Sequence, residues 1–132
     1  MDKVYEGQER RESERIDVNF TVIYRVNSPL SIRMMVGDRE VIAIAVNLSE
    51  GGMAISTTYE LPVSTIVRVK YILLNEKASS ISERMKSIEV LGEVCHSFLA
   101  KDKSYCMGIR FLDLSGSDKL FIANFVKLQK RP

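Results

Sequence analysis

The sequence contains few of the residues on which metal sites and disulfide frameworks depend. Among its 132 residues are two cysteines, one histidine and no tryptophan. Two cysteines do not make the framework that staples small secreted domains, and with a single histidine they do not complete a zinc site. We therefore expect reduced thiols, no metal and no cofactor.

Long apolar runs and strong charge are also missing. No apolar run approaches the roughly 18 residues that span a bilayer, and residues 1–12 lack the apolar core of a secretory signal. These absences predict a cytoplasmic protein without membrane insertion. The formal net charge is only +2, too weak for a strong nonspecific field toward nucleic acid. Any anion must therefore be recognised by the local placement of charge.

Catalytic groups are equally sparse. His96 is the only histidine, and a single imidazole beside a strand pattern is more often a surface side chain than a base or a ligand. No nucleophile–base pair and no isolated pair of carboxylates stands out. Cys95 and Cys106 fall on neighbouring predicted strands, and the burial tendency of cysteine favours small half-buried side chains there. We expect a protein that is not an enzyme.

Strand patterns are abundant. Residues 16–26 alternate between apolar and polar side chains, which is typical of a half-buried strand. Two further segments, 31–36 and 75–87, fit neither a strand nor a helix clearly, and their structure stays open. A hairpin turn at 100–103 joins the last two strand patterns of the chain. The remaining strand patterns are 41–48, 53–57, 65–74, 88–98 and 104–111.

The C-terminal segment, about 115–129, follows a different period. Ser115 or Ser117 is placed to cap the start of a helix there. Short strands, five to seven in number, followed by one helix favour an antiparallel barrel or a strongly bent sheet. The apolar face of the helix belongs to the core or, alternatively, to a dimer surface. Its members at helical spacing are Phe121, Ile122, Phe125 and Leu128.

The length of the chain fits one domain. Residues 1–15 are polar, carry both signs of charge and show no apolar periodicity, so we expect a flexible N-terminal arm. Residues 16–132 then make up the folded domain.

Three arginines stand where the arm meets the first strand: Arg10, Arg11 and Arg15. A guanidinium group is planar and permanently charged, and its fork of donors matches phosphate oxygens and the O6/N7 edge of guanine. The alternative is a solvent-exposed charge cluster in which the arginines pair with neighbouring glutamates. Alone, the stretch does not decide between an anion clasp and this alternative.

A second unusual stretch follows the buried strand pattern at 41–48. Asn47 offers a donor and an acceptor suited to a base edge, and Ser49 offers a hydroxyl. Gly51 and Gly52 permit positive φ and a close approach of backbone N–H groups to a phosphate. The alternative is a plain hairpin turn, for which two glycines suffice.

In their order and spacing, the two stretches resemble the signature of the PilZ domain family. The family pattern R-x-x-x-R corresponds to Arg11 through Arg15, with the common preceding basic residue at Arg10. The pattern [D/N]-x-S-x-x-G corresponds to Asn47 through Gly52, and a later G-x-x-F pattern corresponds to Gly108–Phe111. The likeness covers roughly Glu9 to Leu128.

The resemblance implies an all-β fold with a C-terminal helix, namely a six-stranded antiparallel β-barrel of the PilZ-like split type. It also implies a receptor for the bacterial second messenger cyclic di-GMP, in which ordering of the arm around the ligand signals to an unidentified protein partner. Asn47 stands where the family more often has Asp, which we expect to alter affinity. The ligand-binding residues carried over from the family are Arg10, Arg11, Arg15, Asn47, Ser49 and Gly52; which arginine contacts guanine and which phosphate stays open.

Two other functions compete with this interpretation. One is a PilZ-like barrel that binds no nucleotide and acts as an adaptor. The other is a small OB-type barrel that binds nucleic acid, for which Lys70-Tyr71 and Arg110-Phe111 give only a thin pattern of basic and aromatic residues. Nucleic acid is the less favoured partner. The sequence leaves monomer and dimer, the stoichiometry of the ligand and the downstream pathway open.

Overall fold

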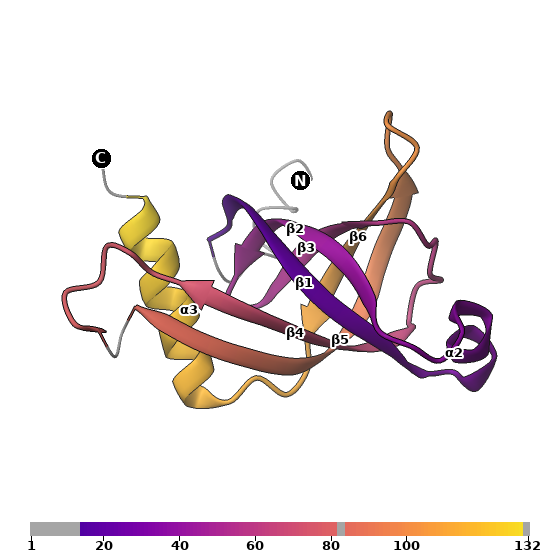
Figure 1. The fold of residues 1–132 in the computed structure, drawn as a ribbon, viewed down its shortest axis with the longest axis horizontal. Helices are drawn as coiled ribbons and strands as arrows, with labels where there is room; N and C mark the ends of the chain where they lie inside the picture. Colours follow the sequence, from indigo (N-terminus) through magenta and orange to yellow (C-terminus); the bar gives the residue numbers. More distant parts are fainter. Residues whose placement is uncertain (1–13, 82–83, 131–132) are drawn as a thin grey trace, which may run out of the picture.

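Alternation of apolar and polar residues produces six strands that pair into a closed antiparallel barrel (Figure 1). The computed structural model describes residues 14–81 and 84–130. The expected six-stranded barrel with a C-terminal helix is confirmed. Its elements are β1 (Ile16–Ser28), α2 (Leu30–Val36), β2 (Val41–Ser49), β3 (Gly52–Thr57), β4 (Ile66–Leu74), β5 (Met85–Leu99), β6 (Tyr105–Phe111) and α3 (Gly116–Gln129).

The strands follow one another around the barrel in the order β1-β2-β3-β6-β5-β4. All six neighbouring pairs are antiparallel, and β4 returns to β1 to close the barrel. Each strand of the closed barrel therefore pairs with a neighbour on both sides over part of its length. Closure also places the start of β3 next to the end of β6, where Gly52 is opposite Arg110, although the two residues are far apart in the sequence.

Inward side chains fill the barrel with a continuous apolar core. Val22, Tyr24 and Val26 of β1 are almost fully buried, as period-two alternation requires. The Tyr24 hydroxyl shares a 2.8 Å hydrogen bond with the Thr57 hydroxyl, so both buried polar groups have a partner. Burial raises the pKa of Tyr24 above its usual range, which keeps the phenol neutral in the core.

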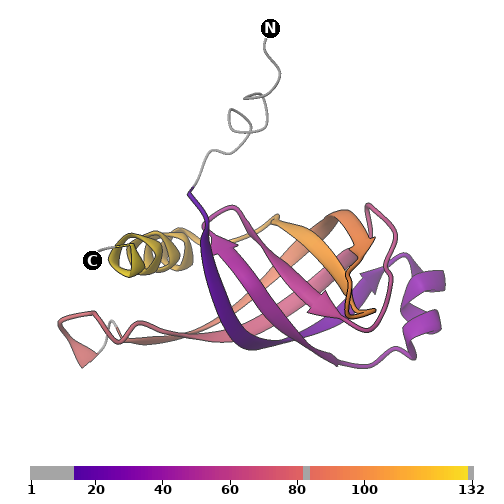
Figure 2. The same cartoon turned by 90° about the horizontal axis from the view of Figure 1, so that it is seen from above.

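The helices α2 and α3 lie at opposite ends of the barrel (Figures 1 and 2). α3 begins where the Ser115 hydroxyl accepts a 3.1 Å hydrogen bond from the Asp118 N–H, which settles the choice of cap. Ile122 and Phe125 are buried in the barrel core, so the apolar face of α3 is core. The β4–β5 hairpin extends beside α3 in both views, and Lys86 Nζ lies 3.1 Å from Asp118 Oδ1.

The open segment 31–36 folds as α2, between β1 and β2. Gly37 ends this helix at a φ of 95°, a conformation that glycine adopts without strain. The Gly37 and Asp38 N–H groups donate to the carbonyls of Met34 and Arg33, which is a Schellman ending. The other open segment, 75–87, is largely a connection, although β5 begins within it at Met85.

Candidate functional site

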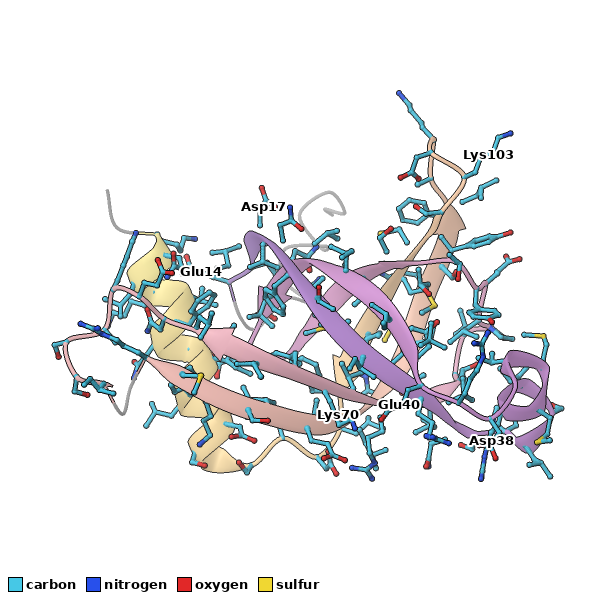
Figure 3. All side chains as sticks on the ribbon, in the orientation of Figure 1. Glu14, Asp17, Asp38, Glu40, Lys70 and Lys103 are labelled. Atoms are coloured by element: carbon cyan, nitrogen blue, oxygen red, sulfur yellow. The ribbon has the colours of Figure 1, made fainter. Side chains whose placement is uncertain are left out.

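The structure brings Arg15 and Asn47 together at one end of the barrel. Arg15 precedes β1 directly, and its Nη1 donates a 3.3 Å hydrogen bond to Asn47 Oδ1 near the end of β2. In Figure 3, the labelled Glu14 and Asp17 lie at the end of the barrel that carries α3. Arg10 and Arg11 lie outside the described residues. The arginine stretch and the turn stretch therefore meet at Arg15 and Asn47.

A β-bulge places Asn47 on the outer surface of the barrel. Ala43 and Ala45 point into the core, and uninterrupted alternation would send Asn47 inward as well. The β2–β3 register shifts between Ala45 and Asn47. The extra residue turns Asn47 outward and Leu48 into the core. A polar side chain thus reaches the surface at a strand position that alternation reserves for the core.

The Asn47 side chain also stabilises the neighbouring strand. Its Oδ1 accepts a 3.0 Å hydrogen bond from the Ala54 N–H, and Ala54 is only 4% exposed. A buried N–H without an acceptor is costly. The carboxamide oxygen is therefore occupied by two donors, and the amide N–H groups are the part of Asn47 suited to donate to a ligand.

This arrangement predicts that Asn47→Ala lowers the free energy of unfolding by about 1–2 kcal/mol, because the Ala54 N–H loses its acceptor. Urea denaturation of the purified chain measures the change. Asn47→Asp is the matched control, since it keeps an oxygen in the same place and should unfold close to the parent midpoint. Equal midpoints for the Ala variant and the parent would show that Asn47 does not support β3.

The turn from β2 to β3 is braced from within by Ser49. Its Oγ accepts a 3.1 Å hydrogen bond from the Gly51 N–H and lies 3.5 Å from the Gly52 carbonyl oxygen. Ser49 is only 2% exposed, so its hydroxyl serves the turn. Direct contact between this hydroxyl and a ligand stays a prediction from the family resemblance.

Gly52 is required by crowding rather than by an unusual backbone conformation. A Cβ at this position would lie 2.1 Å from the Ile109 carbonyl oxygen on β6. Among the described glycines, only Gly37 has positive φ. Gly51 and Gly52 therefore do not use the positive φ that glycine permits. The close backbone neighbour of Gly52 is β6, and an approach of the turn to a phosphate stays a prediction.

A hollow of about 220 Å³ lies between this end of the barrel and α3. Two of its lining groups are carboxylates and one is the ammonium group of Lys127, so the lining offers no excess of positive charge to a ligand with two negative charges. Glu14 Oε2 and Lys130 Nζ are 3.2 Å apart at its side, an exposed pair that contributes little to stability. The outer face of the barrel beside Asn47 is thus the better place for an anion. The lining residues are Glu14, Glu50, Ala123, Val126 and Lys127.

Other kinds of site find little support in the part of the chain that the structure describes. Within residues 14–81 and 84–130, no group of three or more His, Cys, Asp or Glu side chains could hold a metal ion. Over the same ranges, no helix is long and apolar enough to cross a membrane. Cys95 is exposed and Cys106 is half-buried, and neither forms a disulfide. The half-buried position expected for Cys95 is therefore wrong.

The fold and the site together define a class of small antiparallel barrels with an arginine before the first strand and an Asn–Ser–Gly turn beside it. The sequence matches the PilZ domain over residues 9–128, and the chain belongs to this family. No curated protein matches the sequence.

Solved structures show the same fold at low sequence identity. The Bacillus subtilis inhibitor of motility MotI/DgrA aligns with a TM-score of 0.73 at 18% identity, over 93% of this chain and 54% of its own. YcgR of Escherichia coli in complex with c-di-GMP aligns with a TM-score of 0.60 at 15% identity, over 92% and 46%. The isolated PilZ domain of YcgR with c-di-GMP gives 0.56 at 12% identity, over 92% of both chains. The chain thus spans about half the length of MotI/DgrA and of whole YcgR.

Proposed function

We propose that this chain is a receptor for cyclic di-GMP. Its family membership and the structures of PilZ proteins with that ligand support the proposal. The observation that carries it is the 3.3 Å contact between Arg15 and Asn47. This contact joins the two halves of the family signature, which lie 32 residues apart in the sequence.

The chemistry of the ligand matches the groups gathered at this end of the barrel. Cyclic di-GMP has two phosphates and two guanines, so it calls for permanent positive charge and for planar donors. Arg15 supplies both, and Asn47 donates amide N–H groups to a guanine edge. Arg10 and Arg11 complete the clasp from the arm. Ser49 and Gly52 hold the turn against which the ligand rests.

The proposed role is signalling without catalysis. Residues 1–15 form the arm and residues 16–132 form the domain, and binding draws the arm over the outer face of the barrel. Glu14 pairs with Lys130 at the end of α3, so a change in the arm reaches a second surface. A protein partner in the cytoplasm would recognise that change. The chain acts as a monomer or a dimer, although a related PilZ protein from Xanthomonas campestris is tetrameric.

Isothermal titration of the purified chain tests the proposal. We expect saturable heat with cyclic di-GMP at concentrations up to roughly tens of micromolar, with one or two ligands per chain, and none with cyclic di-AMP at the same concentrations. No heat with cyclic di-GMP would contradict the proposal and favour a nucleotide-free adaptor. Tight, salt-sensitive binding of a single-stranded oligonucleotide would instead favour the OB-type function.

A further inference from the structure

A second β-bulge, on β5, turns the only histidine of the chain to the outer surface. Val90 and Val94 point into the core, so uninterrupted alternation would send His96 inward. The β5–β6 register shifts between Val94 and His96, and Cys95 is the extra residue. Both Cys95 and His96 are consequently exposed. This bulge turns His96 to the outer surface, as the bulge in β2 turns Asn47.

The two residues turned outward lie on one row across four strands. Asn47 of β2 is opposite Ala54 of β3, Ala54 is opposite Gly108 of β6, and Gly108 is opposite His96 of β5. Directly opposite residues share a face of the sheet. Neighbouring strands are about 4.8 Å apart, so Asn47 and His96 stand roughly 14 Å apart along the row. Only the small residues Ala54 and Gly108 lie between them.

The His96 ring leans along this row toward Asn47. A Cβ built on Gly108 would lie 2.0 Å from His96 Nε2, so the imidazole occupies the space that a larger residue at 108 would fill. The Phe98 ring stacks beside it, with centroids 6.4 Å apart and planes 15° from parallel. The outer face therefore has the aromatic rings of His96 and Phe98 at one side and the Arg15–Asn47 pair at the other side, with only small residues between them.

We propose that His96 is a further ligand-binding residue and that its imidazole stacks on a guanine held between His96 and Asn47. This inference rests on the proposed function and extends its site across the barrel. A base offers a flat π-face, and proteins commonly stack such faces on His and other aromatic rings. Two independent bulges that present Asn47 and His96 on one row point to a surface shaped for a flat ligand, since bulges that re-aim side chains are frequent beside active sites.

Two substitutions of His96, titrated with cyclic di-GMP, test the stacking contact. We expect His96→Ala to raise Kd by about five- to thirtyfold, the range for loss of one exposed stacking contact. His96→Phe should stay within about threefold of the parent, since it keeps the ring. An unchanged Kd for His96→Ala would overturn the inference. An equal loss of affinity in both variants would overturn stacking, because phenylalanine keeps the aromatic ring but, like alanine, cannot make the hydrogen bonds of histidine. Lys101→Ala, exposed at the end of the same hairpin, should bind as the parent does.

Gly108→Ala tests the geometry of the row. The new Cβ would displace the imidazole, whose exposed end can rotate away, so we expect weaker binding of at least about threefold with little change in thermal stability. In a His96→Ala background the same change should have no further effect. Additive losses in the double variant would overturn the role of Gly108 as the floor beneath His96. A parent chain without affinity for cyclic di-GMP would overturn the proposed function and this inference together, whereas normal parent binding with unaffected His96 variants would overturn only the inference.

Discussion

Replacing Gly52 by alanine is expected to lower the free energy of unfolding by about 2–4 kcal/mol. The added methyl group would lie 2.1 Å from the Ile109 carbonyl oxygen and 3.3 Å from the Arg110 Cα. Both neighbours are backbone atoms of β6, held by the β3–β6 ladder, so neither can rotate away. Relief requires β3 and β6 to separate where the turn joins them.

Chemical denaturation measured by circular dichroism gives this change directly, and the chain offers two matched controls. A Cβ on Gly116 meets no atom within 4 Å, so Gly116→Ala should gain up to about 1 kcal/mol from the helix preference of alanine. For Gly108→Ala the three nearest atoms all belong to the movable His96 ring, so this variant should stay near the parent. A Gly52→Ala midpoint close to those of the controls would show that β6 yields easily, contrary to the close approach described above.

The same substitution links the stability of the turn to ligand binding. Gly52 pairs with Ser49 across the turn and with Arg110 of β6, so a shift at residue 52 also moves the brace at Ser49. The turn then no longer presents Asn47 beside Arg15. We expect Gly52→Ala to lose cyclic di-GMP even at temperatures where it is folded. The glycine of the family signature would thus act through backbone packing and not through contact with the ligand.

Most of the barrel could be predicted from the sequence because half-buried strands carry a simple period. The alternation in 16–26 defines β1 to within two residues of its observed end at Ser28. α2 stayed open because its seven residues are too few to show a helical period. Its clearest local signal, Gly37 as the residue that ends the helix, is equally typical of a plain turn.

The details of the site were harder to predict, because they depend on register and on packing between distant strands. Alternation alone sends Asn47 and His96 to the interior, and nothing in the local sequence marks the bulges that turn them outward. The surroundings of Gly52 depend on β6, which joins the turn only when the barrel closes. The hydrogen bonds by which the Ser49 hydroxyl braces its own turn also depend on how the turn folds, and its expected contact with a ligand stays a prediction. A signature in the sequence therefore locates the site but does not assign a role to each of its residues.

Replacing Arg15 by alanine is expected to weaken binding of cyclic di-GMP by about thirtyfold or more. A charge-assisted hydrogen bond and a bidentate contact to a base each contribute roughly 1–3 kcal/mol, and a tenfold change in Kd corresponds to about 1.4 kcal/mol. Arg15 is the arginine of the signature that the structure places beside Asn47. Its 3.3 Å hydrogen bond to Asn47 is long, so the loss of this contact costs little in folding, and circular dichroism of the variant checks that it is folded.

Titration calorimetry of three variants separates the roles of charge and shape at this position. Arg15→Lys keeps the charge but loses the planar fork, so it should recover part of the affinity if Arg15 contacts phosphate and almost none if it contacts guanine. Arg68→Ala is the matched control, because Arg68 is an arginine on β4 that pairs with Glu89 at 3.6 Å, outside the row from Asn47 to His96. A parent-like Kd for Arg15→Ala would remove the guanidinium clasp from the mechanism, and with it the reason for the signature to begin before β1. Equal losses in Arg15→Ala and Arg68→Ala would mean that the ligand senses only overall charge, which the net charge of +2 makes a weak attraction.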